Sequence, residues 1–218
     1  MPARSCSRPR DDRFAPRLRL VGGCRRRCRV SRVLGFSASS TSITVGTSIS
    51  LLADGVADDL SKGHRVTLGF ECPLFIHISD EPEGLTKARD GEGNRPWSAA
   101  GGCGSLATGL AEYSWIFEKL KTSTKIEVQP IFDWSEFSGG AGNLFVWEAF
   151  VSRKAKETSH IDDATAAARA FWSSIPNVEK STMVTAERPF SLVGAALLRA
   201  GLSNDVRLLK QTCVVISA

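Results

Sequence analysis

The chain has 218 residues, of which 42% are hydrophobic and 23% charged. That composition is typical of one globular domain, and a chain of this length buries enough apolar surface to fold without a disulfide or a zinc ion. No apolar run reaches the roughly 18 residues of a transmembrane helix, and the first residues contain no apolar signal-peptide core. We therefore expect a cytoplasmic protein with no membrane partner.

The formal net charge of +5 is unevenly distributed. Residues 1–32 hold eleven Arg, no Lys and two Asp, so residues 33–218 carry a net charge of −4. An Arg-rich segment could bind phosphates or act as an organellar transit peptide, but this one has Phe14 as its sole aromatic residue. Because it has few apolar residues, we predict that residues 1–32 are a disordered or extraneous tail and that 33–218 form one domain.

Three of the six cysteines, Cys6, Cys24 and Cys28, belong to this basic segment. The Cys24-x3-Cys28 pair lacks the second pair of ligands that a zinc site needs. The other three lie in apolar or glycine-rich surroundings, which indicates reduced, packed thiols.

From residue 30 onward the hydrophobic pattern alternates between strands and helices. Two β-rich runs, 30–38 and 41–49, predict an antiparallel hairpin, and the continuous apolar run 64–70 predicts a strand buried on both faces. The other predicted elements are helix 50–61, a long loop over 79–104, helix 105–121, strands 125–132 and 143–151, helices 159–174 and 190–200, and strand 213–216. The order predicts an α/β fold with a mixed sheet, an antiparallel hairpin plus parallel strands, flanked by helices.

Three acids stand where a catalytic group is commonly placed. Glu71 directly follows the buried strand, where ligands of open α/β sheets gather. Glu148 is the one acid in an apolar strand, and Asp163 shares a helical face with His160. Each also has an ordinary structural interpretation: a turn cap for Glu71, an outward position on an edge strand for Glu148, and a favourable helix-dipole interaction for Asp163.

Together these segments resemble a known family. Gly69-Phe70-Glu71-Cys72-Pro73-Leu74 resembles the Gly-x-Asp-x-Pro-Leu signature of the uncharacterised family called domain of unknown function 429, a member of the ribonuclease H-like superfamily. Val146-Trp147-Glu148-Ala149-Phe150 is similar to the strand that supplies the family's next acid. His160-x-x-Asp163-Ala164 resembles the family's last helix and the corresponding helix of bacterial Holliday-junction resolvases. The resemblance covers roughly residues 36–218 and implies a ribonuclease H-like fold.

The resemblance also implies a chemistry. The superfamily hydrolyses phosphodiesters with two divalent ions held between carboxylates, which here implies Glu71, Glu148 and Asp163 as ligands of Mg²⁺ or Mn²⁺. His160 joins them in the implied catalytic set, and nucleic acid is the implied partner. The chain would then be a metal-dependent nuclease or phosphodiesterase, and the three carboxyl groups should meet in one cleft.

The sequence departs from the family pattern at the first strand. An Asp is expected there, but the run 32–39 carries Ser37, and a neutral hydroxyl is a poor ligand for Mg²⁺. Either the true first strand lies within the basic segment, or the chain does not hold two metals. The alternative function is a non-catalytic binding or regulatory module that keeps the fold and lacks the first acid.

The glycine-rich stretch 91–104 is a second candidate site. Its glycines and Arg95, together with the start of the following helix, could cradle a phosphate, and Trp97 could stack on a base. Against this, most glycine-rich loops are connectors, and a tryptophan is more often packed than exposed.

Overall fold

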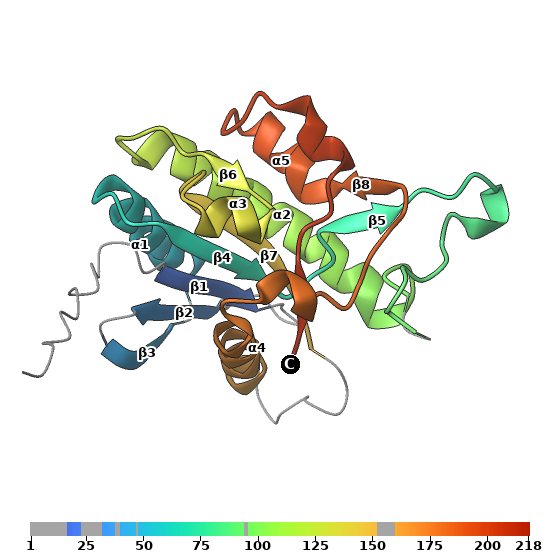
Figure 1. The fold of residues 1–218 in the computed structure, drawn as a ribbon, viewed down its shortest axis with the longest axis horizontal. Helices are drawn as coiled ribbons and strands as arrows, with labels where there is room; N and C mark the ends of the chain where they lie inside the picture. The colour runs from blue at the N-terminus through green and yellow to red at the C-terminus, as the bar shows by residue number, and fades with distance from the viewer. Residues whose placement is uncertain (1–16, 23–31, 38–39, 47, 94–95, 152–159) are drawn as a thin grey trace, which may run out of the picture.

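The computed structural model describes residues 17–22, 32–37, 40–46, 48–93, 96–151 and 160–218. Across these ranges the chain is an α/β protein in which helices flank a mostly parallel sheet (Figure 1). The predicted class is confirmed at this level, including the antiparallel hairpin and the parallel strands that follow it.

The main sheet has the strand order β3-β2-β1-β4-β7-β6, with β9 also paired to β7. Its strands are β1 (Arg17–Gly22), β2 (Arg32–Ser37), β3 (Ser40–Gly46), β4 (Val66–Phe70), β6 (Pro130–Ile131), β7 (Leu144–Phe150) and β9 (Val215–Ser217). β2 runs antiparallel to both of its neighbours, β1 and β3, whereas β1, β4 and β7 are parallel. The carboxyl ends of β1, β4 and β7 therefore lie along one edge of the sheet.

The helices divide between the two faces of the sheet. Three helices enclose the larger hydrophobic core, which we call the α1/α2 core: α1 (Ile49–Ser61), α2 (Ala100–Ser123) and α5 (Leu192–Arg199). Two others, α3 (Trp134–Ser138) and α4 (His160–Ser174), enclose a second, more aromatic core, which we call the α4 core. In Figure 1, α2 and α5 lie above the sheet and α4 lies below it. Three 3-10 turns complete the described chain: η2 (Pro82–Gly84), η3 (Val178–Ser181) and η4 (Val206–Lys210).

Alternation along β7 determines which core each of its side chains enters. Val146 belongs to the α1/α2 core, whereas Phe145 and Trp147 belong to the α4 core, where the Trp147 ring stacks on Phe171 at 4.4 Å. Because successive side chains of a strand point to opposite faces, Glu148 points to the same face as Val146.

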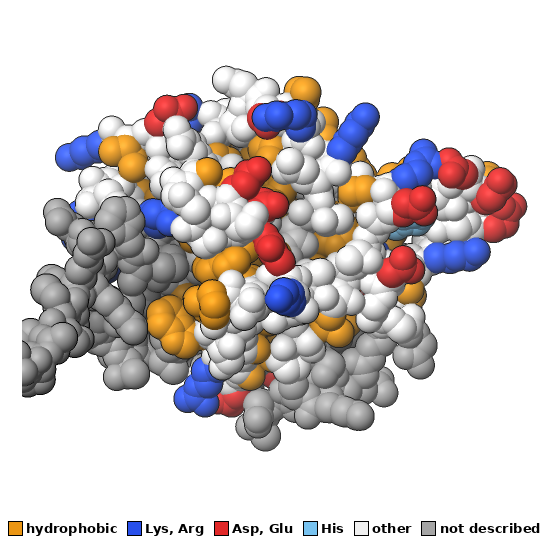
Figure 2. Space-filling view, in the orientation of Figure 1, with side chains coloured by type: hydrophobic (Ala, Val, Ile, Leu, Met, Phe, Trp, Pro, Cys, Tyr) orange, Lys and Arg blue, Asp and Glu red, His pale blue; other side chains and the backbone are white. Residues whose placement is uncertain are grey.

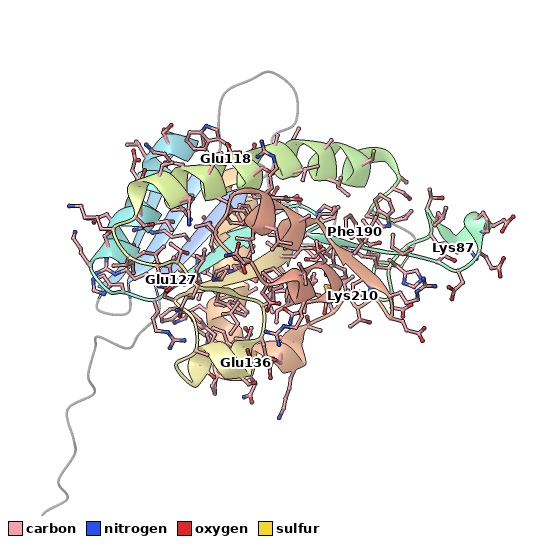
Figure 3. The ribbon with its side chains drawn as sticks, turned by 90° about the horizontal axis from the view of Figure 1, so that it is seen from above. Lys87, Glu118, Glu127, Glu136, Phe190 and Lys210 are labelled. Atoms are coloured by element: carbon pink, nitrogen blue, oxygen red, sulfur yellow. The ribbon has the colours of Figure 1, made fainter. Side chains whose placement is uncertain are left out.

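The segment between β5 (Phe75–His77) and α2 forms an arm. β5 pairs with β8 (Pro189–Ser191) in a separate two-stranded sheet, and residues 78–88 then project away from the body of the molecule. Figure 3 shows Lys87 on this arm, far from the helices that cover the main sheet.

The prediction that residues 1–32 form a disordered tail is wrong for residues 17–22. These residues are β1, which lies between β2 and β4 inside the main sheet. Leu18 is buried in the α4 core, and Arg17 and Arg19 both bind Asp59 of α1, at 2.8 and 2.6 Å. The segment is a strand because polar and apolar residues alternate in it, a pattern that its high Arg content concealed. Residues 1–16 and 23–31 lie outside the described residues.

Other differences concern element bounds. Of the strand predicted over 125–132, Pro130 and Ile131 alone pair with β7, and α2 begins at Ala100, so the loop before it is shorter than predicted. The start of the helix predicted over 190–200 instead belongs to β8, and Ser191 caps α5 by accepting a hydrogen bond from the Gly194 N–H.

Candidate functional site

The carboxyl edge of the main sheet brings the ends of three parallel strands together. Phe70 of β4 pairs with Glu148 of β7 on one side and with Val21 of β1 on the other. Glu71, half-buried, follows Phe70 at a bend. The strand register thus places Glu71 between Gly22, the last residue of β1, and the end of β7.

This register agrees with one of the two alternatives for the first strand, that it lies within the basic segment. The strand parallel to β4 is β1, not the run 32–39, and Ser37 belongs to the antiparallel strand β2. β1 carries no acid, and the residue at its carboxyl end beside Glu71 is Gly22. No carboxylate therefore stands at the end of β1, beside Glu71.

Both carboxylate oxygens of Glu148 accept hydrogen bonds from protein groups. Its side chain is 2% exposed, and the Arg89 guanidinium binds it through Nη2 to Oε1 at 2.6 Å and Nη1 to Oε2 at 2.9 Å. The backbone N–H of Leu74 donates a further hydrogen bond to Oε2 at 2.9 Å. Such a bidentate, charge-assisted pair is among the strongest side-chain interactions in proteins, and it fixes β7 to the segment that follows β4.

A second carboxylate shares the same guanidinium. Glu92 Oε1 lies 2.9 Å from Arg89 Nε and 2.7 Å from Nη2, while Glu92 Oε2 accepts the backbone N–H groups of Arg89 and Trp97. The carbonyl oxygen of Phe75 accepts from Nη1, and the Phe75 ring lies under the guanidinium at 4.5 Å. We call Arg89, Glu92 and Glu148 the buried triad.

The buried triad influences the groups around it. Burial alone would lower the pKa of Arg89, but the charges of Glu148 and Glu92 and the hydrogen bonds with them outweigh it, so its pKa is raised. Burial and, next, the charge of Glu148 raise the pKa of both Cys72 and Cys213 well above the usual value. Both thiols therefore stay protonated at neutral pH, which is the packing role that the sequence indicates for them.

Glu148 and Asp163 belong to different parts of the structure. Asp163 is 1% exposed and lies on α4, which packs against one face of the main sheet, whereas Glu148 points to the α1/α2 core on the opposite face. That the three carboxyl groups meet in one cleft stays a prediction. Among the described residues, no group of three or more His, Cys, Asp or Glu side chains could hold a metal ion.

The other predicted site residues are His160, Arg95 and Trp97, and the structure describes only Trp97 in full. The backbone of His160 begins α4, but its side chain and all of Arg95 lie outside what the structure describes. Trp97 is half-buried, and its indole N–H is buried with no hydrogen-bond partner among the described residues. Its observed role is a backbone hydrogen bond to Glu92, so the loop packs against the buried triad.

Sequence reasoning missed Arg89 and Glu92. Two signals pointed to them: an acid alone in the apolar strand β7 needs a buried cation, and Arg89 stands three residues before Glu92 in a loop. The partner could not be chosen from the sequence, because Arg89 and Glu148 are separated by 59 positions.

A groove lies on the edge of the sheet where β6 ends and β9 begins. It has a volume of about 510 Å³, and Phe132, Cys213 and Val214 are among its lining residues. Its charged lining residues are Asp133, Glu136, Glu179, Glu187 and Lys210. Figure 2 shows acidic side chains gathered beside α3, and Figure 3 places Glu136 on α3 and Lys210 at the end of η4. We call this the acidic groove.

Local hydrogen bonds favour the charged form of one acid of the groove, Asp133. Asp133 caps α3, and the hydrogen bonds from the Ser135 hydroxyl and the Glu136 backbone N–H lower the pKa of Asp133. The Ser135 N–H donates to Glu179 Oε1 at 2.7 Å, which holds Glu179 beside the same helix start. The groove therefore has an excess of negative charge at neutral pH.

Comparison with known proteins gives no assignment. No family model, no curated protein and no solved structure matches this chain. Within the described residues, no helix is both long enough and apolar enough to span a bilayer.

Proposed function

We propose that this chain is a non-catalytic binding module with a ribonuclease H-like fold, related to the family called domain of unknown function 429. The fold part of the proposal is supported by the hairpin followed by parallel strands, with Glu71 at the end of a central strand and Asp163 on the helix after β7. The motifs around these residues supply the resemblance.

The hydrogen bonding of the Glu148 carboxylate is the observation that supports a module without catalytic activity. A carboxylate that binds a catalytic ion needs free oxygen lone pairs, and in this chain both Glu148 oxygens accept hydrogen bonds from Arg89, with Leu74 adding a third. The missing acid at Gly22 removes a second ligand from the same sheet edge. The donor set therefore does not fit the two-metal centre that the resemblance implies.

A metal titration tests this proposal against the nuclease alternative. Calorimetry of the purified protein with MgCl₂ and MnCl₂ should give no saturable binding below about 10 mM, and single- and double-stranded DNA and RNA should remain uncut in either ion. The nuclease would be supported instead by ion binding and cleavage that are both lost in Glu71→Gln and in Asp163→Asn.

The acidic groove is the surface on which this module would take a ligand. Four carboxylates and one Lys around an apolar floor favour a cationic ligand, such as a basic peptide segment of a partner protein. Nucleic acid is disfavoured there, because its phosphates would meet like charge.

Charge reversal tests the groove assignment. A fluorescein-labelled peptide of alternating Arg and Leu should bind the wild-type protein, with an affinity that falls about tenfold in Glu179→Lys and again at high salt. Glu83→Lys is the matched control, since this exposed acid lies on η2 outside the groove lining. If Glu83→Lys lowers the affinity for the peptide as much as Glu179→Lys does, the peptide binds because of the protein's net charge and not because of the groove.

A further inference from the structure

The buried triad has an unusual composition for a protein interior. It contains two carboxylates and one guanidinium, so it carries one excess negative charge, and the three side chains are 0 to 2% exposed. Burying charge in this way is costly unless each group is paired and hydrogen-bonded. Three backbone N–H groups, from Leu74, Arg89 and Trp97, donate further hydrogen bonds to the two carboxylates.

The guanidinium occupies the centre of this arrangement. Nη2 of Arg89 lies 2.6 Å from Glu148 Oε1 and 2.7 Å from Glu92 Oε1, so one cationic nitrogen bridges the two carboxylates. Nε and Nη1 face Glu92 and Glu148 respectively, and Nη1 also reaches the Phe75 carbonyl. A bridging cation between two carboxylate oxygens is also the arrangement in which proteins hold a divalent ion.

We propose that Arg89 is a built-in cation that takes the place of a divalent metal ion between Glu148 and Glu92. While Arg89 is present, the pair of carboxylates binds no metal. When the guanidinium is removed, the two acids form a site for one divalent cation such as Mn²⁺ or Mg²⁺. This inference rests on the same pairing of Glu148 with Arg89 as the proposed function, and it goes further by making Glu92 the second ligand of the site that Arg89 fills. Failure of Arg89→Ala to bind metal would remove this inference alone, whereas metal binding and nucleic-acid cleavage by the wild type would remove the proposed function.

The chemistry explains why removal should create a site. Without the guanidinium, two carboxylates face one another across a buried space, and their mutual repulsion disfavours the charged pair. A divalent ion would neutralise both charges, and carboxylate, carbonyl and water oxygens are the ligands that it prefers. Glu148, Glu92 and the Phe75 carbonyl oxygen supply three such ligands around the vacated position.

The test compares metal-dependent melting of the wild type and Arg89→Ala. The wild-type melting temperature should not change in about 5 mM MnCl₂, whereas that of Arg89→Ala should start lower and rise by at least about 5 °C. The rise should disappear in Arg89→Ala/Glu148→Gln, which lacks one charged ligand. An Arg89→Ala protein that melts at the same temperature with and without Mn²⁺ would overturn the proposal.

A second measurement on the wild type does not depend on the variant folding. In a ¹⁵N amide spectrum, the Leu74 and Trp97 signals report directly on the triad, because both N–H groups donate to its carboxylates. Added Mn²⁺ should broaden these two signals no more than the amide of buried Phe117, in the α1/α2 core. Selective broadening at Leu74 and Trp97 would show that metal competes with Arg89, and the proposal would fail.

Discussion

At the scale of single residues, the pairing of Arg89 with Glu148 decides what the carboxyl edge of the sheet can do. A sequence pattern indicates an acid inside an apolar strand, but the same acid is a metal ligand or half of an ion pair depending on a residue far away in the chain. The structure places Arg89 within 2.6 Å of Glu148, and the acid becomes part of the packing.

A double-mutant cycle should measure how strongly this pair is coupled. Arg89→Met and Glu148→Gln should each lower the free energy of unfolding by about 3–5 kcal/mol, because Arg89→Met leaves two buried carboxylates without their cation and Glu148→Gln removes the carboxylate that pairs with both terminal nitrogens of Arg89. The double variant should lose clearly less than the two single losses combined. Urea unfolding measures all four proteins, and strict additivity would contradict the pairing.

The exposed ion pair of Lys62 and Asp58 on α1 is the control for that cycle. Its nitrogen and oxygen are also 2.6 Å apart, but its side chains are 61% and 58% exposed. Water and salt screen such a pair, so the cycle of Lys62→Met and Asp58→Asn should show no measurable coupling.

The buried thiols predict how stability depends on alkaline pH. Because the pKa values of Cys72 and Cys213 are raised well above the usual 9.0, the folded protein keeps these protons when the unfolded chain loses them. Their contribution to stability is thus complete below about pH 9 and is lost as the pH rises further. Urea unfolding at about pH 8 and pH 10 should show a smaller loss of stability in Cys72→Ala than in the wild type.

Cys103→Ala is the matched control, because Cys103 is exposed on α2. Its loss of stability between the two pH values should equal that of the wild type. If Cys72→Ala and Cys103→Ala behave alike, burial of the thiol is not what sets the pH dependence.

At the scale of elements, the strand β1 is the largest difference between sequence and structure. The composition of residues 1–32 indicated a tail, since eleven Arg outweigh the few apolar residues when the segment is taken as a whole. The alternation in residues 17–22 is short, and its arginines look like solvated charges until Asp59 is placed beside them. Composition averages over a segment, whereas a strand needs only a few alternating residues.

Leu18→Ala tests whether β1 is part of the folded sheet. Leu18 is 1% exposed, so the substitution should lower the free energy of unfolding by about 2–4 kcal/mol. Leu51→Ala, the same change at a residue that is 71% exposed, should stay within about 0.5 kcal/mol of the wild type. If neither variant changes the free energy of unfolding measurably, residues 17–22 are not part of the folded sheet.

Other elements were predictable because their signals are local. The continuous apolar run before Glu71 gave β4, and the apolar periodicity gave α1 and α4 to within a residue or two at each end. The pairing of β4 with β7 is less local, because β5, α2, β6 and α3 come between the two strands in the chain. The face of the sheet to which each β7 side chain points was harder to predict, since a shift of one residue in β7 moves Glu148 from one core to the other.

At the scale of the whole molecule, two features differ in their access to solvent. The buried triad fixes the base of the arm to the sheet and is closed to solvent, whereas the acidic groove is open and charged. This difference agrees with the proposal that the protein recognises a ligand at its surface.

Crystals of the wild-type protein soaked in MnCl₂ show whether Arg89 or a metal ion lies between Glu148 and Glu92. An anomalous difference map should show no manganese at Glu148, with Arg89 still bridging Glu148 and Glu92. A manganese peak about 2.2 Å from a Glu148 carboxylate oxygen, with the guanidinium displaced, would contradict this prediction.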